Sequence, residues 1–234
     1  MISAAAQIIP PPDRLVVNGV ELIVDISGAV VWPERSLMMV ADLHLEKGSA
    51  FAVHGRLLPP YDTRTTLNNL LQTIEKYEIK SVVCIGDSFH DERAADRLCP
   101  ADQDALQALT GRCDWTWICG NHDPAPPENW GGHVAEELTL GPLTLRHEAA
   151  SNCASGEISG HYHPKAAVRV RQRRLSGRCA ISDGRRMILP AFGAYTGGLS
   201  VLDSAISDLF PAGFEVRLLG RNSVFAFPKS ALTL

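Results

Sequence analysis

Acidic, amide and imidazole side chains follow five short apolar runs of this chain. The runs end near residues 41, 85, 119, 146 and 159, and the polar residues after them are Asp42, His44, Asp87, Asn121, His122, Asp123, His147, His161 and His163. Carboxylate oxygen is a hard anionic metal ligand, imidazole nitrogen a borderline ligand and amide oxygen a neutral one. A set of this size and type is suited to holding two divalent cations.

Such a pair of ions favours chemistry on phosphate esters. Two divalent ions bring four positive charges, of which Asp42 and Asp87 neutralise two and a bridging hydroxide a third. The remaining positive charge attracts an anionic phosphodiester. Two ions roughly 3.5–4 Å apart also acidify a shared water and clamp the attacking and leaving oxygens. We therefore predict metal-dependent hydrolysis of a phosphate ester.

Strands and helices must position these side chains. Continuous apolar runs predict strands at 37–41, 81–85 and 115–119, and shorter strands are expected at 138–140, 143–147, 158–159 and 168–170. Leu67, Leu70, Leu71 and Ile74 recur at helical spacing within a helix predicted over 63–77, and a second helix is expected over 102–109. The pattern indicates a mixed α/β fold with helices over two packed sheets. Sites in open α/β sheets form outside the carboxyl ends of strands, so one shared site is expected.

The local spacing supports this interpretation. Asp42 and His44 are separated by one residue, as are His161 and His163, so in extended segments both members of each pair would project to one side. A glycine precedes three of the motifs and is expected to let the backbone turn tightly: Gly86, Gly120 and Gly160. Each motif alone also has an ordinary explanation as a turn, a helix cap or a buried histidine. The five motifs together, each at a strand end, indicate a site.

Length and composition bound the class of protein. The 234 residues predict a single domain over 1–234, and 45% hydrophobic with 21% charged residues is an ordinary globular mix. A net charge of -4 argues against a chain that coats nucleic acid over its whole surface, but it permits a local basic patch. No stretch approaches the roughly 20 apolar residues of a membrane helix, and the start lacks a signal-peptide pattern. Six scattered cysteines are typical of a reduced, cytoplasmic protein.

The motifs resemble the calcineurin-like metallophosphoesterase superfamily. Its signature reads D-x-H, G-D, G-N-H-(D/E), H and G-H-x-H in this order, which here spans residues 37–164. The ligase-associated DNA-damage-response branch is the closer resemblance, and it covers nearly the whole chain through DLHLEKGSAFAVHGRLLPPYDT, GDSFHD and PAFGAYTGG. The resemblance implies an α/β (α+β) fold of the four-layer αββα sandwich type.

The resemblance also implies an allocation of ligands. One ion would be held by Asp42, His44, Asp87 and His163, and the other by Asp87, Asn121, His147 and His161, with Asp87 bridging. His122 would not be a ligand. It would protonate the leaving oxygen or stabilise the transition state while a metal-activated hydroxide attacks phosphorus. Asp123 would bind no metal itself but would orient the side chain of His122.

Several neighbouring residues leave two interpretations open. Many relatives read G-D-x-x-D at the second motif, whereas here His90 stands three residues after Asp87 and Asp91 follows. His90 either contacts substrate or is a surface or cap residue, and the same alternatives hold for His54 and Arg56. Glu46 and Lys47 either line the cleft or are simply solvated.

The segment 165–186 is strongly basic. It carries eight basic residues against one acid, Asp183: Lys165, Arg169, Arg171, Arg173, Arg174, Arg178, Arg185 and Arg186. One interpretation is a surface that receives nucleic-acid phosphates, with binding that weakens as salt rises. The other is a solvated edge strand and hairpin whose charges oppose aggregation. No aromatic residue lies within 169–186, so base stacking is not indicated there.

The predicted function is a binuclear-metal-dependent phosphodiesterase, and the resemblance implies a DNA endonuclease in DNA repair. Two divalent ions are expected, with Mn preferred and Fe, Zn, Co or Ni as alternatives. The partners implied are a phosphodiester substrate such as DNA and the ligase and helicase of a repair system, but no membrane. The alternatives are a phosphomonoesterase or nucleotide phosphodiesterase, and a metal-free protein-binding scaffold, which the intact ligand set disfavours. Nothing in the sequence indicates an oligomeric state.

Overall fold

The first β-sheet supplies three of the loops that carry predicted ligands. The computed structural model describes residues 11, 13–56, 58–125, 130–151 and 155–233. Within them, seven strands lie side by side in chain order: β1 (Arg14–Val17), β2 (Val20–Val24), β3 (Val30–Trp32), β4 (Leu37–Val40), β5 (Ser81–Ile85), β6 (Asp114–Ile118) and β7 (His133–Ala135). Neighbours are antiparallel from β1 to β4 and parallel from β4 to β7. The carboxyl ends of β4, β5 and β6 therefore meet at one edge.

The second sheet is mixed and supplies the other two loops. Its strands run in the order β14 (Leu199–Ser200), β11 (Pro164–Val170), β12 (Arg173–Ser182), β13 (Arg186–Ile188), β10 (Glu157–Ser159), β9 (Leu143–Arg146) and β8 (Glu137–Leu140). β15 (Glu215–Leu219) pairs with β12 and carries β16 (Val224–Pro228) on its other side. β9, β10 and β13 are parallel, so β9 and β10 also end at one edge.

Short and long helices cover the sheets. They are η1 (Pro33–Arg35), α1 (Lys47–Val53), α2 (Asp62–Tyr77), α3 (Ala94–Arg97), α4 (Pro100–Arg112), α5 (Ser204–Ser207) and η3 (Lys229–Ala231). The apolar face predicted for α2 is buried at Leu67, Leu70 and Ile74, and the helix ends where Glu78 turns left-handed at φ 51°. Across the described ranges, no helix has both the length and the apolar character needed to cross a bilayer.

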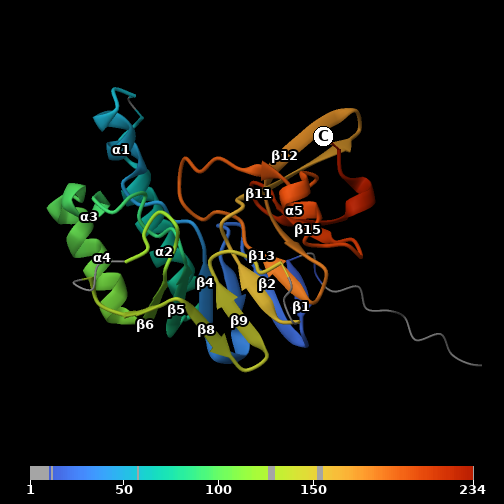
Figure 1. The fold of residues 1–234 in the computed structure, drawn as a ribbon, viewed down its shortest axis with the longest axis horizontal. Helices are drawn as coiled ribbons and strands as arrows, with labels where there is room; N and C mark the ends of the chain where they lie inside the picture. The colour runs from blue at the N-terminus through green and yellow to red at the C-terminus, as the bar shows by residue number, and fades with distance from the viewer. Residues whose placement is uncertain (1–10, 12, 57, 126–129, 152–154, 234) are drawn as a thin grey trace, which may run out of the picture.

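Three apolar clusters separate four layers. Alternate residues of each central strand enter different clusters: Met38 and Val40 of β4 pack under α2 and α4, whereas Leu37 and Met39 face the second sheet. On its far side, the second sheet packs Val168 and neighbouring residues against α5 and the segment that follows it. Figure 1 shows α1–α4 on one side of the paired sheets and α5 on the other. The predicted α/β fold, a four-layer αββα sandwich, is confirmed, although its outer layer over the second sheet is thin.

The predicted elements differ from the observed ones mainly in the second half of the chain. β5 has the predicted bounds, and α4 extends the predicted helix at both ends, with Pro100 at its first position. β11 begins at Pro164, directly after His163, and not at the predicted residue 168. The first three strands, α1 and the strands from β13 onward were not predicted. They depend on pairing and packing with distant segments, which leave weak local patterns.

Candidate metal centre

The loops after five strands bring the predicted ligands together in two groups. The first group is Asp42, His44 and His163, and the second is Asp87, His147 and His161. Within each group the potential ligand atoms all lie within 4.8 Å of one another. The residues of each group come from both sheets, so the site lies where the carboxyl ends of β4 and β5 face those of β9 and β10.

The contacts within each group are between atoms that donate lone pairs to metals. In the first group, His163 Nε2 lies 3.2 Å from His44 Nε2 and 3.4 Å from Asp42 Oδ1. In the second, His147 Nε2 lies 3.4 Å from Asp87 Oδ1 and 3.1 Å from His161 Nδ1. A neutral imidazole carries only one proton, so such crowding of nitrogen and carboxylate oxygen suits a shared cation.

Asp87 and Asn121 complete the arrangement. Asp87 reaches both groups, because its Oδ2 lies 3.8 Å from His44 Nε2 and its Oδ1 3.4 Å from His147 Nε2. Asn121 Oδ1 lies 2.9 Å from both His147 Nε2 and His161 Nδ1. The structure thus brings together all the side chains that the resemblance assigned to two ions, with Asp87 between the two groups. Their binding of metal stays a prediction.

Burial favours the neutral, metal-binding form of two of the imidazoles, those of His44 and His161. Desolvation, with smaller contributions from His163 and Lys47, lowers the pKa of His44 to about 2. Burial also lowers the pKa of His161. Metal ligands must be deprotonated, and a neutral imidazole offers a free lone pair. The buried carboxylates of Asp42 and Asp87 supply the negative charge, so the residues present fit divalent cations.

The ligand loops adopt an unusual backbone conformation. Five predicted ligands have positive φ: Asp42 (55°), His44 (45°), Asp87 (48°), His161 (72°) and His163 (47°). The expectation that the two x-spaced pairs sit on extended segments is therefore wrong, although both members of each pair do reach the site. Left-handed conformations cost about 1–2 kcal/mol per non-glycine residue, and such strain clusters at functional sites.

Hydrogen bonds hold these loops in place. The backbone N–H groups of Asp42 and His44 donate to the carbonyls of Gly86 (3.2 Å) and Asp87 (2.9 Å). The N–H of His161 donates to the carboxylate of Asp42 at 3.1 Å. The first ligand loop is thus tied to the second and the fifth, which offsets the local strain.

The three glycines that precede ligand motifs mainly allow neighbouring loops to pack closely against the backbone. Of the three, only Gly86 has positive φ, at 71°, so a left-handed backbone is required there and not at Gly120 or Gly160. The N–H of Tyr162 donates to the carbonyl of Gly160 at 2.9 Å, so the chain turns tightly at Gly160 as well. A β-carbon at Gly86 would overlap the imidazole of His147, and one at Gly120 would overlap Asp87. At Gly160 it would lie 2.7 Å from Ala41 Cβ. Absence of a side chain lets the ligand loops pack directly on one another.

His122 is held by a backbone group that the sequence did not point to. Its Nδ1 lies 2.9 Å from the carbonyl oxygen of His90, and its backbone N–H donates to Asp87 Oδ1 at 2.9 Å. The carboxylate of Asp123 instead accepts from the N–H groups of Ser88 (2.8 Å) and Phe89 (3.1 Å). Asp123 therefore contacts the loop of Asp87, whereas the carbonyl of His90 holds the ring of His122, so the orientation of His122 by Asp123 stays a prediction. Burial raises the pKa of Asp123 to about 7.

The residues whose roles the sequence left open fall into two sets, those that line a cavity beside the centre and one that is buried away from it. His54, Arg56 and His90 line a cavity of about 530 Å³ together with His122, so the structure brings them beside the centre. Glu46 does not line the cleft: its side chain is buried and accepts from Thr63 Oγ1 at 2.8 Å. That bond anchors α1 to α2, a role that no local pattern indicates.

The basic segment does not act as one surface. Arg178 donates to the carbonyls of Ala191 (2.6 Å) and Phe192 (3.2 Å), and the buried Arg186 pairs with Glu157 at 3.2 Å. The exposed basic residues are Arg169, Arg171, Arg173, Arg174 and Arg185. All but Arg185 lie on the hairpin of β11 and β12, which extends at the upper right of Figure 1.

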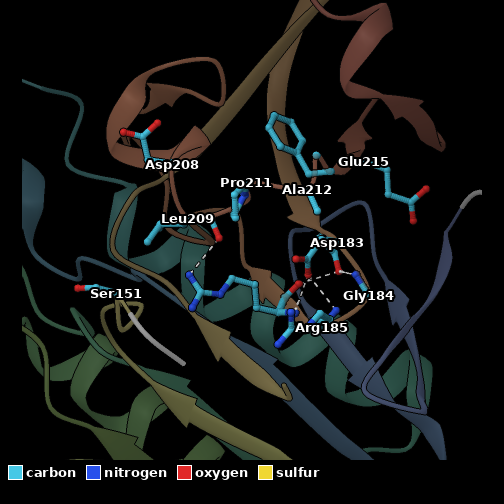
Figure 2. Close-up of a pocket in the computed structure, with 13 residues that line it drawn as sticks. Ser151, Asp183, Gly184, Arg185, Asp208, Leu209, Pro211, Ala212 and Glu215 are labelled. Carbon is cyan, nitrogen blue, oxygen red and sulfur yellow. Dashed lines mark hydrogen bonds between the residues drawn. The ribbon is translucent and has the colours of Figure 1, made fainter. Parts of the chain in front are cut away.

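A larger cavity lies away from these ligands. It measures about 730 Å³ and is lined by residues that include Ser151, Asp183, Arg185, Asp208 and Glu215 (Figure 2). It adjoins the start of β13, whereas the ligand loops follow the opposite end of the paired strand β10. It contains none of the predicted ligands, so the smaller cavity is the one relevant to the centre.

Comparisons with known proteins include a match to a nuclease. No family model and no curated protein matches the chain. Among solved structures, the nuclease MPE of Pseudomonas putida is 27% identical, and the match covers 92% of this chain and 98% of that one with a TM-score of 0.70. The predicted family resemblance is confirmed. A protein of unknown function, AQ665 from Aquifex aeolicus, matches 54% of this chain and 77% of its own length at 12% identity and a TM-score of 0.38, too low to carry an argument.

Proposed function

We propose that this chain is a binuclear-metal-dependent phosphodiesterase that acts on DNA as an endonuclease. The observation that carries the proposal is the pair of ligand groups that meet at Asp87, with its two carboxylate oxygens 3.4 Å and 3.8 Å from histidines of different groups. The similarity to a nuclease over nearly the whole chain supports it. We further propose that residues 1–234 form a single catalytic domain and that Mn²⁺ is the preferred metal.

The chemistry divides between the ions and the side chains. When bound, two divalent ions supply an acidified water and neutralise charge on the phosphate. His122 would act on the leaving oxygen. Because the carbonyl of His90 can only accept, the hydrogen bond to it requires a proton on Nδ1 of His122. To act as a general acid, His122 would carry a second proton on Nε2, in the imidazolium form, and would give that proton to the departing oxygen while Nδ1 keeps its own.

Asp123 would act as a positioning residue. Its carboxylate holds the N–H groups of Ser88 and Phe89, so it fixes the turn that presents Asp87. The N–H of His122 in turn donates to Asp87. Ligand and acid are therefore coupled through one buried network, and a change at Asp123 should reach both.

The substrate, partners and location form a further part of the proposal. The exposed arginines of the β11–β12 hairpin are suited to nucleic-acid phosphates, and the similarity to a nuclease supports a nucleic acid as the substrate, for which we propose DNA. The ligase and helicase partners rest on the family resemblance alone. Free thiols at Cys84, Cys113 and Cys179 support a reducing cytoplasmic location.

A metal-by-substrate panel tests the proposal. Purified protein, stripped and reloaded with Mn²⁺ or another divalent ion, would be given bis-p-nitrophenyl phosphate, p-nitrophenyl phosphate, cyclic nucleotides, and single- and double-stranded DNA. We expect metal-dependent cleavage of the diesters and of DNA. Faster hydrolysis of p-nitrophenyl phosphate than of the diesters would favour the phosphomonoesterase. Protein that takes up no metal and cleaves no phosphoester would favour the scaffold.

A further inference from the structure

A cavity opens directly beside His122 without including any predicted ligand. Its volume is about 530 Å³, and its lining residues are Ala50, Phe51, His54, Arg56, His90, Asp91 and His122. Small-molecule sites commonly measure about 300–1,000 Å³, so this space accommodates one nucleotide unit. Because His122 forms part of the wall, a group that fills the cavity would lie next to the proposed acid.

Aromatic rings form one wall of the cavity. The rings of His90 and His122 stack with centroids 5.4 Å apart and planes 21° apart. The half-buried ring of Phe51 lies 5.9 Å from that of His90. Aromatic faces of this kind receive nucleic-acid bases, and they do so without strong sequence preference.

The charge of the cavity favours an anion. Arg56 is exposed at its rim, and Lys47 Nζ lies 6.0 Å from the centre of the Phe51 ring. The acid on the wall, Asp91, is already engaged by Arg97 at 2.8 Å and by the N–H of Arg93 at 2.9 Å. The guanidinium of Arg56 is therefore not neutralised by Asp91 and suits a phosphate.

The wall that carries Phe51 is held firmly. The N–H of Gly48 donates to Asp62 at 2.8 Å, and Ser49 Oγ accepts from Arg97 Nε at 2.9 Å. Together with the Glu46–Thr63 bond, these contacts fix α1 against α2 and α3. A preformed wall lowers the ordering cost of binding a ligand.

We propose that this cavity is a nucleoside subsite for the leaving-group side of the scissile phosphate. Phe51 and His90 would contact the base, and Arg56 would contact the next phosphate along the strand. The inference rests on the proposed function, and it makes the preferred substrate an oligonucleotide and not a small phosphate ester.

Kinetics with paired substrates tests the subsite. Phe51→Ala and Arg56→Gln would be compared with the wild type on an eight-residue oligothymidine and on bis-p-nitrophenyl phosphate, which lacks a sugar and a second phosphate. We expect the ratio of kcat/KM for the oligonucleotide to that for the small ester to fall about 10-fold in each variant, mainly through KM. Phe51→Trp should restore most of the ratio lost in Phe51→Ala.

Val53→Ala is the matched control, because Val53 lies on the same helix, is 71% exposed and does not line the cavity. Its ratio should equal that of the wild type. An unchanged ratio in both Phe51→Ala and Arg56→Gln, or an equal loss on both substrates, would overturn the subsite while the proposed function stands.

If the wild type cleaves no phosphoester, the proposed function fails. Binding of labelled oligothymidine, measured by fluorescence anisotropy, then tests the subsite alone. Weaker binding in the two variants supports it, and unchanged binding overturns it.

Discussion

At the scale of single residues, the chemistry of the side chains was predictable and their backbone geometry was not. Aspartate, asparagine and histidine after successive strands indicated the ligands, and Asp42, Asp87 and His147 lie together as expected. The left-handed conformations of His161 and His163 were not predictable, because residues other than glycine adopt positive φ only rarely, even though histidine does so more often than most. The bond from His122 to the carbonyl of His90 was also invisible, because every residue has a carbonyl.

His122 should be essential for turnover but not for metal binding. His122→Ala removes the proposed acid while leaving both ligand groups intact, so we expect kcat on bis-p-nitrophenyl phosphate to fall about 10²–10⁴-fold. Metal content, measured by mass spectrometry, should match the wild type. A parallel loss of bound metal would show that His122 is a ligand and that the assigned role is wrong.

Gly86 should be required for the second ligand group. Gly86→Ala adds a β-carbon that would overlap the His147 imidazole, and its φ of 71° disfavours any side chain. We expect the variant to bind less than the full complement of Mn²⁺ and to lose most activity.

Gly19→Ala is a control that introduces the backbone strain expected of Gly86→Ala without the clash with His147. Gly19 has a comparable φ of 82°, but a β-carbon there would meet nothing within 4 Å. This variant should lose about 1 kcal/mol of stability and retain its metal. Equal metal loss in both variants would show that strain alone, and not contact with His147, explains the effect.

At the scale of elements, periodicity predicted those that bury one apolar face. α2 and the central strands follow this rule, and their bounds differ from the predicted ones by about one residue. α1 was missed because it is short, contains Gly48 and depends on polar bonds to α2. The sequence offered a strand and hairpin in the region of β12 only as one of two interpretations, because the first half of β12, RRLSG, is mostly exposed, and pairing with β11 and not burial determines the strand there.

A buried carboxylate joins the β2–β3 turn to the end of α2. Asp25 accepts hydrogen bonds from Lys76 (2.5 Å), Ser27 N–H (2.8 Å) and Tyr77 (2.9 Å). Burial raises the pKa of Asp25, but these bonds outweigh it, and the pKa ends below its usual 3.8. The unfolded chain therefore binds the proton more readily, so the stabilisation is present above about pH 4 and is lost as pH falls further.

Asp25→Ala should accordingly lose stability in a pH-dependent way. We expect the free energy of unfolding in urea to fall by about 1–3 kcal/mol at pH 7, because charged hydrogen bonds are lost. The difference from the wild type should shrink at pH 3. A difference that is constant between the two pH values would show that packing, and not the charge of Asp25, is responsible.

At the scale of the whole molecule, the acidic total conceals an uneven charge distribution. The formal net charge is -4, yet Arg169, Arg171, Arg173 and Arg174 gather on one exposed hairpin. The family resemblance predicted the four layers, whereas the order of strands in the second sheet depends on pairings between distant segments. Sequence could show the arginines but not that β11 starts directly after His163, which links the hairpin to the proposed centre.

This link makes salt dependence the property that decides between the two interpretations of the hairpin. If its arginines contact DNA phosphates, each contact releases condensed counterions, and the logarithm of the binding constant falls with the logarithm of salt concentration. The double variant Arg171→Gln, Arg173→Gln should then bind single-stranded DNA more weakly, with a slope reduced in magnitude by about 2. Arg185→Gln is the control, because Arg185 is exposed but lies beyond the opposite end of β12. Identical slopes in all three proteins, measured by fluorescence anisotropy between 50 and 300 mM salt (roughly the range over which such contacts weaken), would identify the arginines as charges that keep an edge strand from aggregating.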